Sequence, residues 1–261
     1  ISMAGRTAGL SMQQVRLYSA NYATSLLNGG QTAQAIGLLE DLGSGCAANP
    51  QEDGCRCVHY YLGDAYFRTN QPSQAEPFLR MALSSQWEHE PIYSGNTMRL
   101  YLKYGICLQR LDRYADSQPF LETALLIGTE LFGIEHPETL STANKLTTTY
   151  ARQGKFLDAL RVARVGLDGN LAIWGRYDEE TAIAYSLYTR ALTSAGRVTE
   201  ACDAGSELIG ILEETCGVQH WKTGLAHLGL ADALDAAGRR DEALREATLA
   251  FGMLRGNIVA G

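Results

Sequence analysis

Gly154-Lys155-Phe156-Leu157-Asp158-Ala159 is the stretch that decides the fold, because it recurs along the chain. It returns as Gly196-Arg197-Val198-Thr199-Glu200-Ala201 and as Gly238-Arg239-Arg240-Asp241-Glu242-Ala243, each copy starting 42 positions after the one before. Upstream, segments 112–117 and 70–75 keep this period, and segment 30–35 begins 40 positions before Asn70. Periods of about 20–50 residues are typical of solenoids and repeat arrays. The sequence therefore predicts six tandem units.

Other positions agree with this register. Thr97, Thr139, Thr181 and Thr223 stand 42 positions apart, and so do Gly133, Gly175 and Gly217. Within a unit the apolar spacing is helical on both sides of a short turn. We predict an all-α, right-handed superhelical solenoid of about six helix-turn-helix units, forming a single domain over residues 11–255. The units span about 13–45, 55–86, 97–131, 138–173, 180–215 and 222–254, with flexible termini at 1–10 and 256–261.

Small residues recur where the two helices of a unit must approach closely, since a bulky side chain there would push the helices apart. In the first helices these are Ala23, Gly63, Gly105, Thr147, Thr189 and Ala231, and in the second helices Ala35, Ala75, Ser117, Ala159, Ala201 and Ala243. Larger residues precede the first column, namely Tyr22, Leu62, Tyr104, Leu146, Tyr188 and Leu230. We expect both columns to be buried.

Charge and hydropathy exclude some classes of function. The 22 basic and 29 acidic residues give a net charge of −7, which disfavours binding to a nucleic-acid backbone. No stretch approaches the roughly 18 apolar residues of a membrane helix, and the segment Ile1 to Leu10 lacks the pattern of a signal peptide. We therefore expect an intracellular, cytoplasmic protein that binds neither nucleic acid nor membrane and keeps its cysteines reduced.

The cysteines offer one alternative. Cys55-Arg56-Cys57-Val58-His59, with Cys46 upstream, brings together ligands that suit zinc. The spacing is not that of the usual Cys-x-x-Cys site, and no second ligand pair follows at a matching distance. We favour small apolar residues at the start of a helix over a structural zinc.

Catalytic patterns are not evident. The five histidines are scattered, and His136 and His220 fall in joints between units, where helix capping explains them. The chain has no glycine-rich phosphate loop and no nucleophile elbow. Trp87, Trp174 and Trp221 lie in or near the joints, where we interpret them as packing residues. We expect no enzyme activity, no cofactor and no metal.

The pattern Leu62-Gly63, Tyr66, Ala75 and Ala82 resembles the tetratricopeptide repeat (TPR) family. The 42-residue period, with the joint Leu131-Phe132-Gly133-Ile134-Glu135-His136-Pro137-Glu138-Thr139, resembles the kinesin light chain subclass. This resemblance implies a groove that binds short peptides, often acidic and aromatic, with inward asparagines holding the peptide backbone. Asn144 matches such an asparagine, whereas Leu102, Ser186 and Leu228 stand at the equivalent positions.

The first helix of each unit should line the groove, and the helical period selects its inward side chains. The expected peptide contacts are Tyr60, Asp64, Arg68, Gln109, Arg110, Asn144, Thr148, Arg152 and Arg190. Arg68, Arg110 and Arg152 stand 42 positions apart, and a guanidinium suits carboxylates and phosphates. The alternative is that an arginine near a helix C-terminus only supports the helix.

These features predict a scaffold or adaptor that binds an acidic or phosphorylated peptide segment of a protein partner. The alternative function is a sensor or regulatory domain of a larger signalling ATPase or enzyme. The last helix carries Leu249, Phe251, Met253 and Leu254, with no further amphipathic helix to cover them. We therefore expect self-association or domain packing through this helix.

Overall fold

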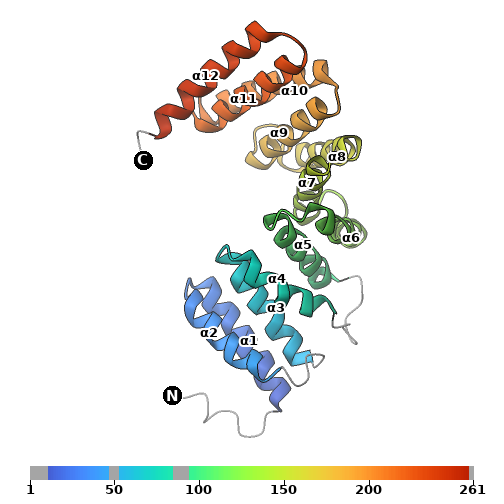
Figure 1. Ribbon diagram of the computed structural model, residues 1–261, viewed down its shortest axis with the longest axis vertical. Helices are drawn as coiled ribbons and strands as arrows, with labels where there is room; N and C mark the ends of the chain where they lie inside the picture. The colour runs from blue at the N-terminus through green and yellow to red at the C-terminus, as the bar shows by residue number, and fades with distance from the viewer. Residues whose placement is uncertain (1–10, 47–52, 85–93, 259–261) are drawn as a thin grey trace. The chain divides into compact units, whose positions relative to one another are not determined.

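A computed structural model describes residues 11–46, 53–84 and 94–258, and every regular element in these ranges is an α-helix (Figure 1). The helices follow one another in six pairs joined by short turns, as predicted. They are α1 (Met12–Asn28) with α2 (Thr32–Ser44), α3 (Asp53–Arg68) with α4 (Pro72–Ser84), α5 (Gly95–Arg110) with α6 (Tyr114–Phe132), α7 (Pro137–Arg152) with α8 (Phe156–Trp174), α9 (Glu179–Ser194) with α10 (Val198–Cys216), and α11 (Trp221–Ala236) with α12 (Arg240–Ile258).

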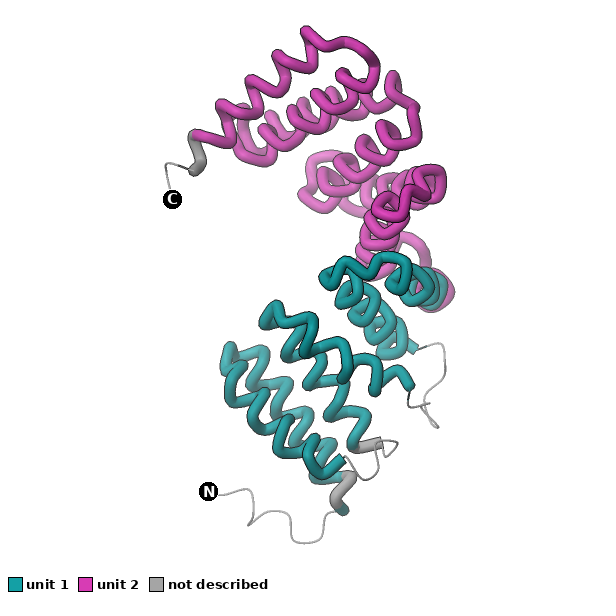
Figure 2. The backbone as a smooth tube through the Cα atoms, in the orientation of Figure 1, with its two compact units in different colours: residues 1–127 teal, residues 128–261 magenta. Residues whose placement is uncertain are grey.

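The chain divides into two compact units, residues 1–127 and 128–261 (Figure 2). We call them unit 1 and unit 2. The boundary falls within α6. The single domain over residues 11–255 stays a prediction, and the two units are described separately below.

The recurring glycine stands where the turn inside each pair needs it. Gly154, Gly196 and Gly238 have φ angles of +73°, +77° and +77°, a conformation that side chains with a Cβ rarely adopt. Asn70 and Asp112 take the same place in earlier pairs, with φ angles of +58° and +57°. Asparagine and aspartate tolerate this region better than other residues. The repeat therefore follows from the geometry of one turn.

The histidines of the joints cap helices, which confirms their interpretation. His136 Nδ1 accepts a hydrogen bond from the Glu138 amide at 3.3 Å, and His220 Nδ1 accepts one from the Lys222 amide at 3.2 Å. Asp178 plays the same part at the start of α9, where its carboxylate accepts from the Glu180 amide at 2.9 Å. Each bond satisfies an amide that the first turn of a helix leaves without a backbone partner.

Close approach within pairs explains the column of small residues. A Cβ placed on Gly63 would lie 2.7 Å from Leu79 Cγ, and one on Gly105 would lie 2.7 Å from Leu121 Cγ. Ser117 is fully buried and donates its hydroxyl hydrogen to the Gly105 carbonyl at 2.8 Å. The backbones of paired helices therefore pass too closely for larger side chains.

The column of larger residues is buried with one exception. Tyr104 donates a hydrogen bond to Glu76 of the preceding pair at 2.9 Å, and Tyr188 accepts one from Arg164 of the preceding pair at 3.2 Å. Tyr22, however, is 50% exposed, contrary to expectation. It stands in the first pair, where the described residues include no earlier pair to cover it.

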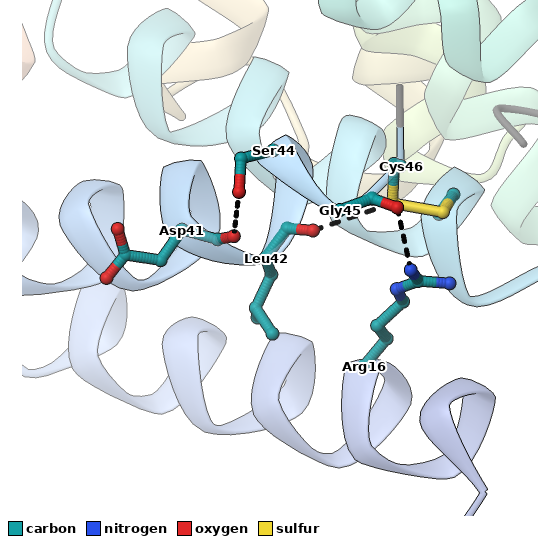
Figure 3. Close-up of a disulfide and its surroundings, with 7 residues drawn as sticks. Arg16, Asp41, Leu42, Ser44, Gly45 and Cys46 are labelled. Carbon is teal, nitrogen blue, oxygen red and sulfur yellow. Dashed lines mark hydrogen bonds between the residues drawn. A yellow bond between two sulfur atoms is a disulfide. The ribbon is translucent and has the colours of Figure 1, made fainter. Parts of the chain in front are cut away.

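The expectation of reduced cysteines is wrong at one joint. Cys46 and Cys55 form a disulfide, with their Cα atoms 5.4 Å apart (Figure 3). The end of α2 and the start of α3 lie close together, and Arg16 of α1 donates to the Gly45 carbonyl at 2.9 Å beside the bond. Cys57, Cys107, Cys202 and Cys216 are thiols. The described residues contain no group of three side chains arranged to bind a metal.

Helix α12 continues to Ile258. The flexible termini at 1–10 and 256–261 stay a prediction. Segments 1–10 and 259–261 lie outside the described residues, as does Trp87. No helix in the described ranges has both the length and the apolar character that a membrane crossing requires.

Candidate functional site

In unit 1, Asp64, which was expected to contact a peptide, is buried and bonds to side chains of two helices. Its side chain is 4% exposed and accepts a hydrogen bond from Arg68 Nε at 2.9 Å. Lys103 of α5 also donates to Asp64, and its ammonium lies 5.0 Å from the centre of the half-buried Tyr60 ring. The carboxylate is therefore neutralised from both α3 and α5, so it is not available to a partner.

The two arginines of unit 1 that were expected to contact a peptide, Arg68 and Arg110, bind the preceding helix pair. Arg68 Nη1 donates to Asn28 Oδ1 at 3.1 Å, and Arg110 Nη1 donates to the Phe67 carbonyl at 2.8 Å. The Arg110 guanidinium also lies 4.0 Å from the centre of the Phe67 ring, which is cation–π geometry. The neighbouring Gln109 is half-buried. These arginines join successive pairs, a role that differs both from peptide binding and from support of their own helix.

In unit 2, three expected contacts line one cavity. We call this space, of about 220 Å³ between α7 and α9, the arginine cavity. Its lining residues are Thr147, Thr148, Ala151, Arg152, Leu187, Arg190, Ala191 and Ser194. The structure thus brings together Thr148, Arg152 and Arg190, whose side chains were expected to face a partner.

The charges of the arginine cavity favour an anion. Arg152 and Arg190 are both exposed, and Arg190 forms no ion pair with the described residues. The cavity lies at the C-terminal ends of α7 and α9, where each helix dipole contributes about half a negative charge. The guanidinium of Arg190 could donate paired hydrogen bonds to an incoming carboxylate or phosphate, and the hydroxyl groups of Thr148 and Ser194 line the same cavity.

Asn144 faces its own helix pair. Its Oδ1 atom lies 3.1 Å from the position that a Cβ on Gly166 of α8 would occupy. Its backbone carbonyl accepts the hydroxyl hydrogen of Thr148 at 3.2 Å. The side chain that matches a peptide-binding asparagine in sequence thus packs toward α8.

A larger cavity was not anticipated from the sequence. We call it the apolar pocket: it measures about 480 Å³ and lies among α9, α10 and α11. Its lining residues are Tyr177, Asp178, Glu179, Ala182, Ile183, Ser186, Leu208, Leu212, Thr215, Cys216, Trp221, Lys222, Leu225 and Ala226. Trp221 is 42% exposed here, and Trp174 is 45% exposed, so neither is fully packed into its joint.

An ion pair marks the rim of the apolar pocket. Lys222 Nζ donates to Glu179 Oε1 at 2.5 Å, connecting the starts of α9 and α11. This hydrogen bond lowers the pKa of Glu179 and raises the pKa of Lys222. The pocket combines apolar walls with a few charged groups at its edge, as is common in ligand sites.

The C-terminal helix presents a mixed surface. Leu249 and Phe251 are 50% and 65% exposed, as expected for an uncovered face. Met253 is buried instead, and Leu254 is half-buried, because both pack against Gly224 of α11.

Comparison with known proteins agrees with the repeats. The family model for the tetratricopeptide repeat matches residues 96–172, and a second model of that description matches residues 224–247. Tetratricopeptide repeat protein 19, mitochondrial, of Mus musculus is 38% identical over 77 residues, or 27% of this chain. The match spans only 21% of the length of that relative.

Solved structures share the fold at low sequence identity. A Podosopora anserina protein assigned as a kinesin light chain, with nearly identical TPR-like repeats, superposes with a TM-score of 0.67 at 18% identity, covering 76% of this chain and 94% of that one. YrrB, described as a TPR protein with an unusual peptide-binding site, superposes with a TM-score of 0.59 at 14% identity, covering 84% and 90%. Residues 96–172 and 224–247 therefore match tetratricopeptide repeats, and the chain has the fold of the TPR solenoids.

Proposed function

We propose that this protein is a non-enzymatic scaffold or adaptor that binds an acidic or phosphorylated peptide segment of a partner at the arginine cavity. The TPR fold supports the scaffold class, and a structural neighbour, YrrB, is described as having a peptide-binding site. The 42-residue period supports a place within the kinesin-light-chain-like subclass. The proposed contacts in unit 2 are Thr148, Arg152 and Arg190.

One observation carries this proposal: two exposed arginines line the same concave space between neighbouring first helices. A guanidinium forms paired hydrogen bonds with the oxygens of a carboxylate or phosphate. Arg68 and Arg110 bind Asn28 and the Phe67 carbonyl, and they do not line this cavity. The acidic group of the partner should therefore bind in unit 2.

The test is an array of synthetic peptides that is probed with the purified chain. Each peptide is made in three versions, with serine, phosphoserine or glutamate at one position. We expect phosphoserine and glutamate peptides to be preferred, and the variant Arg152→Ala/Arg190→Ala to lose that preference. Arg161→Ala is the matched control, since Arg161 is 72% exposed on α8 and pairs only with Asp158 among the described residues. A preference that survives in the double variant would refute the proposal.

The cytoplasmic location stays a prediction, and the Cys46–Cys55 bond makes it testable. Disulfides are rare in reducing compartments and common in oxidising ones. Thiol labelling of the protein in its native cells tests this. If the compartment is reducing, Cys46 and Cys55 should both be labelled, and if neither is labelled, the compartment is oxidising.

A further inference from the structure

We propose that the first helix pair of one copy of this chain docks on the last helix pair of a second copy, as though it were the next repeat. Tyr18, Tyr22 and Ser25 of α1 form what we call the N-terminal end face, and Leu244 and Phe251 of α12 form the C-terminal end face. Neither face belongs to the arginine cavity, so the proposal goes beyond the proposed function. It assigns a partner surface to the exposed face of α12.

The N-terminal end face is exposed where every later pair is covered. Tyr18 is 58% exposed, and Tyr22 and Ser25 are exposed as well. The three residues follow one another at i, i+4 and i+7, so they share one face of α1. In α3, α5, α7, α9 and α11 the residues at these three positions are all buried, as Leu100, Tyr104 and Cys107 are in α5.

Contacts inside the chain show what buries this face in later pairs. The thiol of Cys107 in α5 donates to the Pro72 carbonyl of α4 at 3.2 Å. In the last pair, Leu230 Cδ1 of α11 lies 3.3 Å from where a Cβ on Gly205 of α10 would stand. The face therefore packs against the second helix of the preceding pair. Among the described residues no such helix precedes α1.

The C-terminal end face is the opposite half of the same kind of interface. Leu244 and Phe251 are exposed and stand seven positions apart on one face of α12. The equivalent residues of the two preceding pairs are buried, namely Leu160 and Leu167 in α8 and Cys202 and Ile209 in α10. Each of those pairs has a following pair to cover it, and the described residues include none after α12.

The apolar side chains of the two end faces match each other. Inside the chain, Tyr104 contacts Glu76 in the second helix of the preceding pair. Tyr22 stands at the position of Tyr104 in its own pair, and Leu244 stands at the position of Glu76. The equivalent contact between two copies places an aromatic ring against a leucine. Both side chains leave water when the copies meet, which favours association.

A polar contact inside the chain also has its counterpart at the ends. Lys103 of α5 donates to Asp64 of the preceding pair. Asn21 of α1 stands at the position of Lys103, Asp232 of α11 stands at the position of Asp64, and both are exposed. Between copies the Asn21 amide therefore donates to the Asp232 carboxylate. Residues 12–28 include no acidic side chain that would oppose this contact.

The proposed contact is heterologous, because each copy uses a different face toward each neighbour. Such contacts produce open chains of copies, or rings where the rotation closes. The end faces comprise few residues, and small interfaces are typical of weak association, so we expect it at concentrations on the order of 100 µM.

The test uses sedimentation velocity on the full chain and on two variants that are each altered at one end. Tyr22→Glu alters the N-terminal end face, and Phe251→Glu alters the C-terminal end face. The native chain should associate, whereas each variant alone should stay monomeric at the same concentration. An equal mixture of the two variants should form a dimer and nothing larger, since each variant supplies the one face that the other lacks.

Matched controls place the same charge on exposed residues beside the end faces. Leu17→Glu on α1 and Leu249→Glu on α12 should leave association unchanged, because the residues at these positions stay exposed inside unit 2. Dimers of Tyr22→Glu alone would show that α12 pairs with itself and would overturn the proposal. So would a mixture of the two variants that stays monomeric. Arg152→Ala/Arg190→Ala should associate like the native chain, so failure of this proposal does not affect the proposed function.

Discussion

Individual residues set how closely the paired helices pass. Gly105 lies against Leu121, and the gap between their helices has no room for a methyl group. Gly210 in α10 is also helical, yet no atom stands within 4 Å of the position of its missing Cβ. Substituting alanine at each of the two glycines therefore distinguishes the effect of packing from the effect of backbone entropy.

We expect Gly105→Ala to lower the free energy of unfolding by about 1–3 kcal/mol, because the new methyl group overpacks the contact with Leu121. Gly210→Ala should instead raise it by about 0.5–1 kcal/mol, since alanine is the better helix former. Urea denaturation followed by circular dichroism measures both. If both variants are stabilised, the helices are not as closely packed as described.

Tyr66 links pH to stability. It donates a hydrogen bond to Glu40 of the preceding pair, and this bond, together with burial, raises the pKa of Tyr66 to about 12. The folded state thus favours the neutral phenol. Its contribution is complete below pH 10, the ordinary pKa of tyrosine, and is lost as the pH rises from about 10 to 12.

Tyr66→Phe should therefore be less stable than the native chain near pH 8, by about 0.5–1.5 kcal/mol, the usual worth of one hydrogen bond. This difference should narrow as the pH rises above 10. Urea titrations at several pH values measure this difference. Tyr104 and Tyr185, whose pKa values are also raised to about 12, are present in both proteins, so their titration cancels in the comparison. A difference that stays constant would contradict the assigned pKa.

At the scale of elements, the disulfide connects α2 to α3 across nine positions of sequence. A closed loop of this length restricts the unfolded chain, which stabilises the folded state by about 2–3 kcal/mol in the chain-entropy description. We expect Cys46→Ser/Cys55→Ser to lower the free energy of unfolding by that amount, so the variant should unfold at a lower urea concentration. Dithiothreitol should have the same effect on the native chain and none on the variant. Equal stability of oxidised and reduced protein would contradict the bond.

The exposed face of α12 carries a second prediction at this scale. Leu244 and Phe251 are 69% and 65% exposed and stand seven positions apart, on one face of the helix. Burying this face in another copy would remove apolar surface from water. We expect sedimentation velocity to show concentration-dependent association that Phe251→Glu abolishes, with Arg245→Glu as an exposed control. A monomer at every concentration would refute self-association.

At the scale of the whole molecule, the features that repeat were predictable and the features that differ between repeats were not. The turn at Gly154 is set by local sequence, so the period at which that sequence recurs predicted the helix pairs. The roles of Arg68 and Arg110 depend on acceptors 40 and 43 positions upstream, which no local pattern indicates. The apolar pocket is lined by residues of three helices, α9, α10 and α11, which no local pattern brings together. The disulfide depends on how a joint folds back between two pairs.

The central claim is that Arg190 contacts the acidic group of a bound peptide in unit 2. A calorimetric double-mutant cycle tests it, combining Arg190→Ala with replacement of that acidic group by alanine in the best peptide from the array. The account predicts a coupling energy of about 1–3 kcal/mol, because either change alone already removes the interaction between Arg190 and the acidic group. Additive losses, with a coupling energy near zero, would contradict it.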